Sequence, residues 1–185
     1  MMSSYPGEPG ASQTSTDARR WRQFEAAIRQ HHGDLHAFAY RVLGGRSEAE
    51  DALQAAYVKA FRAVGTGAIE QSLSRPWLFR VLYRCCVDEF RRTARTEHDV
   101  LNEFTLAGRS EEGQPGLVSA ISRAFLALPS PTRAAVLLVD VHGLSYDEAA
   151  AALGVPRGTI ASRLNHGRAA LRRALPEYAP EWRTS

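Results

Sequence analysis

The sequence predicts an all-α protein, built as two small helical domains joined by a flexible linker. Apolar residues recur at helical spacing through most segments, and no long β-branched alternation appears. Glycine and proline fall between those segments, where helices end. An acidic stretch without helical periodicity separates the two helical parts. The expected division is a disordered tail at 1–17, a first domain at 18–96, a linker at 97–116, a second domain at 117–175 and a C-terminal tail at 176–185.

Charge is unevenly distributed along the 185 residues. The formal net charge is only +3, but arginines crowd residues 75–95 and 157–173. Two separate basic stretches suggest two contacts with a polyanion. The alternative is ordinary surface charge in a chain that prefers arginine, because Lys59 is its single lysine.

The amino-terminal part predicts two short amphipathic helices. Apolar residues from Trp21 to Ile28 suggest the first, and those from Leu35 to Leu43 the second, with Gly33 interrupting between them. No basic start followed by an apolar run marks a signal peptide, and no apolar run reaches membrane-spanning length. His32 and His36 have the spacing of metal ligands, but no third ligand is visible, so no metal site is expected.

A third helix is expected after the turn at Gly44-Gly45, with Ser47 as its cap. Its apolar side comprises Ala49, Leu53, Ala56, Tyr57, Ala60, Phe61 and Val64. A loop at 65–74 follows and contains no aromatic residue. The next long helix begins near Pro76, and we favour core packing over base stacking for its Trp77. Cys85 and Cys86 are the only cysteines, so they are expected to be reduced and partly buried, without zinc.

The carboxy-terminal part predicts four helices that form a small domain. The first spans 117–128 and ends at Leu128-Pro129; the second is a buried helix at 132–142, with His142 as a terminus residue rather than a catalyst. Ser145 and Glu148 have capping-box spacing and predict the start of the third. Gly154 suits a left-handed helix end, and Pro156 suits the first turn of the fourth.

The third and fourth of these helices form a predicted helix-turn-helix motif. Ile160, Leu164 and Leu171 should face the core. The opposite face contains no acidic residue, and side chains of this kind reach phosphates and base edges in a major groove. The alternative is a solvated face in a bundle that never touches DNA. The candidate DNA-binding residues on this face are Arg157, Thr159, Ser162, Arg163, His166 and Arg168.

This motif resembles the carboxy-terminal promoter-binding region (region 4) of bacterial sigma factors of the extracytoplasmic-function (ECF) group. The sequence departs from the family pattern at Ala161 and at 165–167, which affects the base sequence read. The resemblance implies that the second domain binds the minus-thirty-five element. The matching residues are Leu144, Ser145, Tyr146, Glu148, Ala150, Leu153, Gly154, Gly158, Thr159, Ser162, Arg163 and Leu164.

The first domain resembles region 2 of the same family, which binds core RNA polymerase and opens the minus-ten element. Arg84 stands where many members have an asparagine in the base pocket; arginine donates but does not accept, so base preference should change. The resemblance implies polymerase contacts at Asp51, Gln54, Ala55 and Val58. It implies minus-ten contacts at Trp77, Arg80, Arg84, Asp88, Arg91 and Arg92.

The resemblance implies three kinds of partner: core polymerase through its largest-subunit clamp helices and flap, promoter DNA, and as a further candidate an anti-sigma factor. The acidic linker would run through the catalytic cleft of the polymerase, imitating RNA. We expect a cytoplasmic protein that is not an enzyme, needs no cofactor and does not insert into a membrane. The alternatives are a stand-alone helix-turn-helix regulator, usually a dimer on a palindrome, and a protein-interaction bundle without DNA binding.

Overall fold

The computed structural model describes residues 11–66, 73–99 and 117–176, and every regular element within them is a helix. The all-α prediction is therefore confirmed. The predicted loop at 65–74 and linker at 97–116 lie mostly outside the described residues. None of the described helices combines the length and the apolar character that a bilayer-spanning segment requires.

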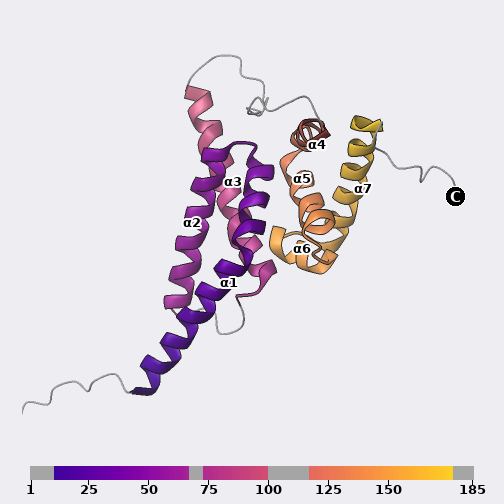
Figure 1. Ribbon diagram of the computed structural model, residues 1–185. Coiled ribbons are helices and arrows are strands. Elements are labelled where there is room, and N and C mark those ends of the chain that lie inside the picture. Colours follow the sequence, from indigo (N-terminus) through magenta and orange to yellow (C-terminus); the bar gives the residue numbers. More distant parts are fainter. Residues whose placement is uncertain (1–10, 67–72, 100–116, 177–185) are drawn as a thin grey trace, which may run out of the picture.

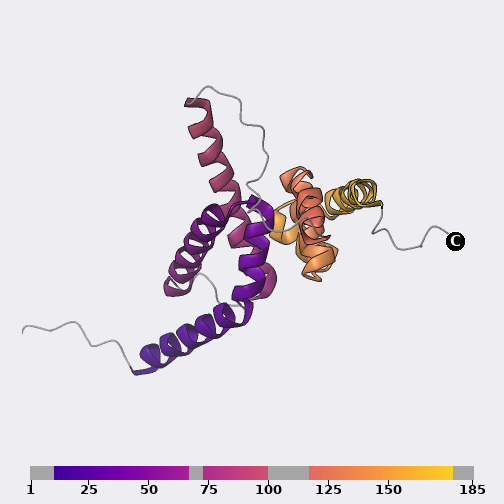
Figure 2. The same cartoon turned by 45° about the horizontal axis from the view of Figure 1, so that its top comes forward.

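Three long helices form the amino-terminal half: α1 (Ala11–Leu43), α2 (Arg46–Gly65) and α3 (Arg75–Asp99), which pack pairwise (Figure 1). The prediction of two helices split at Gly33 is wrong, because α1 is continuous, although it changes direction along its length (Figure 2). A glycine inside a helix costs only about 1 kcal/mol relative to alanine. Burial of Leu35 and Phe38 just beyond it outweighs that cost. The helix also begins at Ala11, within the tail for which disorder was expected.

The turn between α1 and α2 uses Gly44 at φ 82°, a left-handed conformation that favours glycine. The expected cap at Ser47 is wrong: α2 begins at Arg46, and Gly45 occupies the cap position without a side-chain hydrogen bond. Phe61 also departs from its predicted place on the apolar side, since it is 53% exposed. Its ring instead contacts Trp21 of α1, with centroids 4.4 Å apart.

The carboxy-terminal half contains α4 (Leu117–Leu126), α5 (Ser130–Val136), a π-helical turn η1 (Leu137–Val141), α6 (Tyr146–Leu153) and α7 (Arg157–Ala174). The predicted helix at 132–142 is confirmed in part: α5 and η1 run on without a break and bury residues 133–138, but Val141, predicted to be buried, is 47% exposed. The wider π turn ends with the amide of His142 donating to the carbonyl of Leu137 at 2.9 Å.

The two halves pack directly against each other. Helix α6 lies on α3, while α1 contacts α4 and α5, so the two groups of helices lie side by side (Figures 1 and 2). Buried residues of both halves belong to one hydrophobic core. Gly44 takes part, because a methyl group at its Cα would lie 2.8 Å from a methyl carbon of Leu126. The sequence had predicted two domains on a tether and gave no sign of this contact.

Candidate functional site

Helix α6 begins and ends as the sequence predicted, with a capping box at Ser145 and a left-handed glycine at Gly154. The amide of Glu148 donates to Ser145 Oγ at 3.2 Å, and the amide of Ser145 donates to Glu148 Oε2 at 2.8 Å. The bonds that the Glu148 carboxylate accepts from the amide and the hydroxyl of Ser145 hold the pKa of Glu148 below its usual value. Gly154 ends α6 at φ 67°. Pro156 lies one residue earlier than predicted, at the cap position of α7 rather than in its first turn.

Helix α7 presents two different faces. Ile160 and Leu164 are fully buried against the core, and Leu171 packs partly against it. The six candidate DNA-binding residues lie away from these buried side chains and are exposed or half-buried: Arg157, Thr159, Ser162, Arg163, His166 and Arg168. The helix therefore presents a basic and polar face toward solvent, the arrangement that groove reading needs.

Intramolecular contacts already engage two arginines of that face. Arg157 Nε lies 3.3 Å from Asp147 Oδ1, and its guanidinium lies 5.7 Å from the ring centre of Tyr146. Arg168 makes two hydrogen bonds to Asp140, at 3.0 and 2.6 Å, which raise its pKa further. A bidentate arginine–carboxylate pair fixes both side chains. Arg168 is thus less available to DNA than the sequence suggested.

The remaining polar residues of α7 are less constrained. Ser162 Oγ lies 3.4 Å from His166 Nδ1. Arg163 forms no ion pair among the described residues, but its charge acts on the hydroxyl of Tyr83 in α3, whose pKa is raised chiefly by burial and lowered in part by that arginine. Arg163 is therefore available for a ligand.

Helix α3 presents a second basic stripe. Arg80, Arg84 and Arg91 are exposed, follow one another at helical spacing and form no ion pair within the described part of the chain. Asp88 lies in the same stripe but accepts a hydrogen bond from Lys59 of α2 at 3.0 Å. Trp77 is half-buried and packs against the core, as the sequence analysis favoured. The stripe can offer three guanidinium groups to a polyanion.

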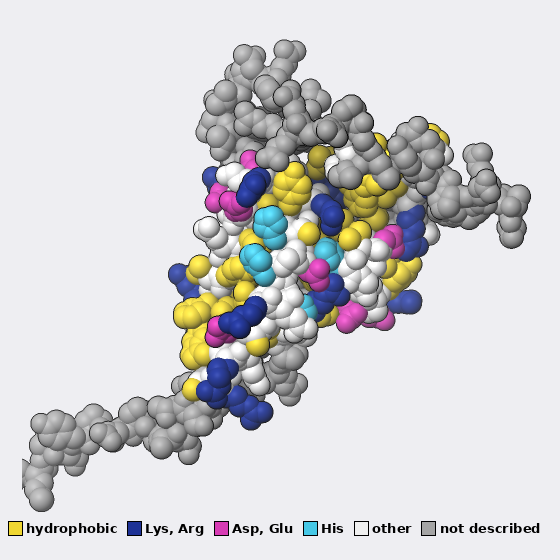
Figure 3. Space-filling model, in the orientation of Figure 1, with side chains coloured by type: hydrophobic (Ala, Val, Ile, Leu, Met, Phe, Trp, Pro, Cys, Tyr) yellow, Lys and Arg dark blue, Asp and Glu magenta, His cyan; other side chains and the backbone are white. Residues whose placement is uncertain are grey.

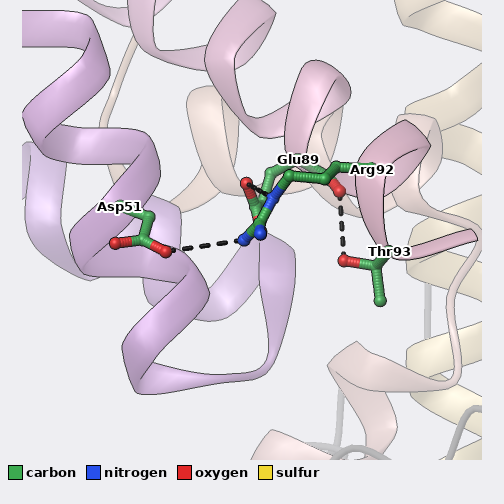
Figure 4. A network of polar contacts seen from close by, with 4 residues as sticks. All are labelled: Asp51, Glu89, Arg92 and Thr93. Atoms are coloured by element: carbon green, nitrogen blue, oxygen red, sulfur yellow. Dashed lines mark hydrogen bonds and ion pairs between the residues drawn. The ribbon is translucent and has the colours of Figure 1, made fainter. Parts of the chain in front are cut away.

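Arg92 lies at the centre of a polar network that joins α3 to α2 (Figure 4). Its guanidinium bonds both carboxylate oxygens of Glu89, a residue only 8% exposed, and lies 3.5 Å from Asp51 Oδ2. Thr93 Oγ1 donates to the carbonyl of Glu89 at 3.1 Å. A candidate DNA contact, Arg92, is thus held beside a candidate polymerase contact, Asp51, which sequence separation alone did not indicate.

The candidate polymerase-binding residues Asp51, Gln54, Ala55 and Val58 are all exposed on α2. Their spacing places them on one face, and Val58 is 48% exposed although it is apolar. A single exposed apolar side chain is common on a protein surface and does not by itself indicate an interface. In the face of the molecule that Figure 3 shows, basic and acidic side chains are interspersed over both halves and form no single basic sheet.

The two cysteines are buried and unpaired, at 3% exposure for Cys85 and 0% for Cys86. Burial raises the pKa of both thiols, that of Cys86 to about 12. A neutral buried thiol is a poor nucleophile and a poor metal ligand. His32, the other candidate considered for metal binding, has Nδ1 2.8 Å from the hydroxyl of Tyr57.

Two arginines that the sequence analysis did not single out as functional join the halves. Arg133, 7% exposed, donates to the carbonyls of Val42 at 2.6 Å, Leu126 at 2.6 Å and Leu128 at 2.9 Å. Arg75 donates to the carbonyl of His142 at 2.6 Å. A signal for Arg133 was present, because it directly precedes the apolar run 134–139 in a helix predicted to be buried.

His142 lies between the halves. Its ring centre is 6.0 Å from that of Phe38 and 4.9 Å from that of Phe79. Burial lowers the pKa of His142 to about 4, and nearby Asp34 opposes that shift only in part. Its Nε2 and the Nε of Arg133 are buried without a hydrogen-bond partner among the described residues.

Comparison with known families matches both halves. Residues 27–96 match the family model described as Sigma-70 region 2, and residues 119–171 match Sigma-70, region 4. The ECF RNA polymerase sigma factor SigM of Mycobacterium tuberculosis is 35% identical over 153 residues, covering 82% of this chain and 76% of that protein. SigE of Mycolicibacterium smegmatis, also an ECF sigma factor, is 33% identical over 165 residues. That match covers 85% of this chain, which spans 63% of the relative's length.

Solved structures match across both halves together. The sigma factor RpoE of Bartonella quintana, solved in complex with the anti-sigma factor NepR, superposes with a TM-score of 0.69 at 27% identity. It covers 83% of this chain and 96% of its own. CnrH, solved in complex with the cytosolic domain of CnrY, superposes with a TM-score of 0.62 at 24% identity, covering 88% and 96%.

Proposed function

The chain belongs to the extracytoplasmic-function group of RNA polymerase sigma factors, and from this premise we propose how its surfaces divide the work of promoter recognition. It binds core RNA polymerase and directs it to promoters. Bond formation in RNA synthesis belongs to the polymerase, so this chain supplies binding energy and specificity rather than a catalytic group. It acts where the polymerase acts, in the cytoplasm.

The polymerase-binding surface is the exposed face of α2. On this face the exposed apolar Val58 can be buried on docking. The carboxylate of Asp51 and the amide of Gln54 beside it can form directional hydrogen bonds with the polymerase. The family assigns such a helix to the clamp of the largest subunit. We expect the same docking here.

The minus-ten element is bound by the stripe on α3. Arg80, Arg84 and Arg91 have no intramolecular ion pair among the described residues, so binding DNA requires no bond of theirs to break. Guanidinium groups follow the phosphate backbone and stack on unpaired bases. Arg84 is the residue we expect to set base preference, because it only donates hydrogen bonds.

The minus-thirty-five element is bound by α7 in the major groove. Arg163 is the principal reader, since Arg157 and Arg168 are held by Asp147 and Asp140. Ser162 and His166 flank it and supply further donors and acceptors.

An anti-sigma factor is a further partner of this chain. The support is the whole-length superposition on RpoE, whose structure was solved with the anti-sigma factor NepR. A stand-alone helix-turn-helix regulator is disfavoured, because such a protein needs neither the α2 face nor the α3 stripe.

The observation that carries this function is the presence of both sigma regions in order on one chain. Runoff transcription tests it: core polymerase is mixed with this protein and a genomic promoter library, and start sites are mapped. Selective starts that depend on the protein are expected. Core polymerase that neither binds the protein nor gains selectivity would refute the function.

A further inference from the structure

Asp88 is the acidic member of the stripe on α3, and its neighbours in the stripe are arginines. Arg84 lies four residues before it and Arg91 three residues after it, which are the spacings at which side chains on a helix surface meet. A carboxylate at either spacing attracts an arginine. Neither Arg84 nor Arg91 forms an ion pair within the part of the chain that the structure describes, so another group must hold Asp88 away from them.

Lys59 of α2 is that group. Helices α2 and α3 pack against each other (Figure 1), and Nζ of Lys59 lies 3.0 Å from Oδ2 of Asp88. This hydrogen bond is the largest of the causes that raise the pKa of Lys59, so the ammonium keeps its charge at neutral pH. The side chains of Lys59 and Asp88 are 52% and 57% exposed, and the pair therefore lies at the molecular surface, as the arginines do.

Helix α7 shows the opposite arrangement. Lys59 is the single lysine of the chain, so the carboxylates beside α7 have no lysine partner, and each engages an arginine instead. Asp147 lies 3.3 Å from Nε of Arg157. Asp140 accepts two hydrogen bonds from Arg168, at 3.0 and 2.6 Å. Two arginines of α7 are thus held within the protein, while the three arginines of the α3 stripe are not.

Lys59 also governs the charge that DNA meets at the stripe. A carboxylate without a cation beside it repels phosphate groups, because charges within about 10 Å act on each other at 0.1 M salt. The ammonium of Lys59 neutralises Asp88 from the neighbouring helix. The positive charge of the stripe therefore acts undiminished on a polyanion.

We propose that Lys59 is a positioning residue for minus-ten binding: from α2 it engages Asp88 and thereby keeps Arg84 and Arg91 of α3 available to DNA. This inference rests on the proposed function, because the ligand is the minus-ten element. An exposed ion pair shifts an equilibrium by only about two- to fivefold. Losing Lys59 both frees Asp88 to capture an arginine and unmasks its charge, so the expected loss of DNA affinity is roughly three- to tenfold.

Holoenzyme reconstituted from core polymerase and each full-length variant tests this role. The probe is a labelled single-stranded oligonucleotide with the non-template sequence of a promoter mapped by runoff transcription, and fluorescence anisotropy gives its affinity at several salt concentrations. Lys59→Met should weaken binding roughly three- to tenfold. It should also reduce the slope of log affinity against log salt by about 0.7, the value for one phosphate contact on a single strand.

Two further variants at the surface of α2 serve as comparisons. Lys59→Arg keeps the charge and can still pair with Asp88, so it should bind within about twofold of wild type. Arg62→Met is the matched control, because it removes a charge of the same sign from an exposed position three residues further along α2. It should leave both the affinity and the salt slope unchanged.

Asp88→Asn separates an indirect role of Lys59 from a direct contact. Asparagine forms no ion pair with an arginine, so adding Lys59→Met to Asp88→Asn should cause no further loss of affinity. An equal loss in both backgrounds would show that Lys59 contacts the DNA itself, and would overturn the positioning role. Unchanged affinity and salt slope in Lys59→Met alone would overturn it as well.

Circular dichroism and the affinity for core polymerase are measured for every variant. Both should stay unchanged, because Lys59 lies at the surface; a loss of polymerase affinity in place of DNA affinity would contradict the proposal. Wild-type holoenzyme that does not prefer the promoter strand to a scrambled strand would refute the proposed function. Wild-type preference that Lys59→Met leaves intact would refute the positioning role alone.

Discussion

The guanidinium of Arg133 lies 2.6 Å from the carbonyl oxygen of Val42, a residue 91 positions earlier in the chain. Val42 is part of the last turn of α1, where main-chain carbonyls lack helical partners. The same guanidinium donates to the carbonyl of Leu126, the last residue of α4, and to that of Leu128, two residues beyond the helix. One buried charge therefore satisfies the ends of two helices from different halves.

Arg133→Met is expected to destabilise the chain by about 3 kcal/mol, because it leaves buried carbonyls without a donor. Urea unfolding followed by circular dichroism measures this. Arg123→Met is the control: Arg123 is exposed on α4 and donates to Ser119 on the same helix, so a change within about 0.5 kcal/mol is expected. Equal effects of the two substitutions would show that the carbonyl contacts contribute nothing.

The contact between the two halves should weaken as pH falls. The buried, neutral His142 at this contact has a pKa of about 4, while an exposed histidine titrates near 6.5. The contact therefore has its full stability above pH 6.5 and loses stability as pH falls toward 4. Separation of the halves, which exposes His142, should be about tenfold more favourable at pH 5.5 than at pH 7.5, as measured by small-angle X-ray scattering.

The charged groups that act on His142 are Asp34 and Arg41 of α1 and Arg75 of α3. Asp34 favours the protonated ring, and the two arginines oppose it. His142→Gln cannot titrate, so its compactness should not change over this pH range. A variant that kept the same pH dependence would assign it to another group.

Arg163→Ala should weaken binding to the minus-thirty-five element by about 1–3 kcal/mol if Arg163 makes a bidentate base contact. Arg168→Ala should weaken this binding less, because Arg168 already donates two hydrogen bonds to Asp140. Electrophoretic mobility shifts with a mapped promoter give both affinities. The reverse order of the two losses would remove Arg163 from the role of principal reader.

Asp51→Ala combined with Gln54→Ala should weaken polymerase binding while leaving the fold intact, as co-purification would show. Asp51 also lies 3.5 Å from Arg92, so its loss disturbs a contact within the chain. Arg92→Gln breaks that contact and keeps the carboxylate. If this control reduced polymerase binding equally, the effect would arise from the pair and not from docking.

Two glycines of α7 should respond oppositely to alanine. A Cβ at Gly167 would lie 2.6 Å from Val136 Cγ2 and 3.0 Å from Thr132 Cγ2, so overpacking should cost about 1–3 kcal/mol. A Cβ at Gly158 meets nothing within 4 Å, so the better helix former should stabilise by up to about 1 kcal/mol. Thermal unfolding of both variants checks the pair.

Local signals in the sequence were enough to predict most of the helices, the turn before α7 and the family. The Ser145–Glu148 capping box and Gly154 are local signals, since each depends on residues within a few positions, and both lie where predicted. The periodicity that buries Ile160 and Leu164 is local in the same sense. Errors arose where packing overrode a local preference, at Gly33 within α1 and at Phe61 on the surface.

Which arginines are available to DNA, and how the halves meet, depends on packing between segments far apart in the sequence. Arg168 resembles Arg163 in sequence, yet Asp140, 28 residues away, engages one and not the other. Arg75 meets His142 across 67 residues, and Arg92 meets Asp51 across two helices. Ion pairs and burial depend on distance in space, and a pattern of period 3.6 carries no information about which distant helix will cover a given face.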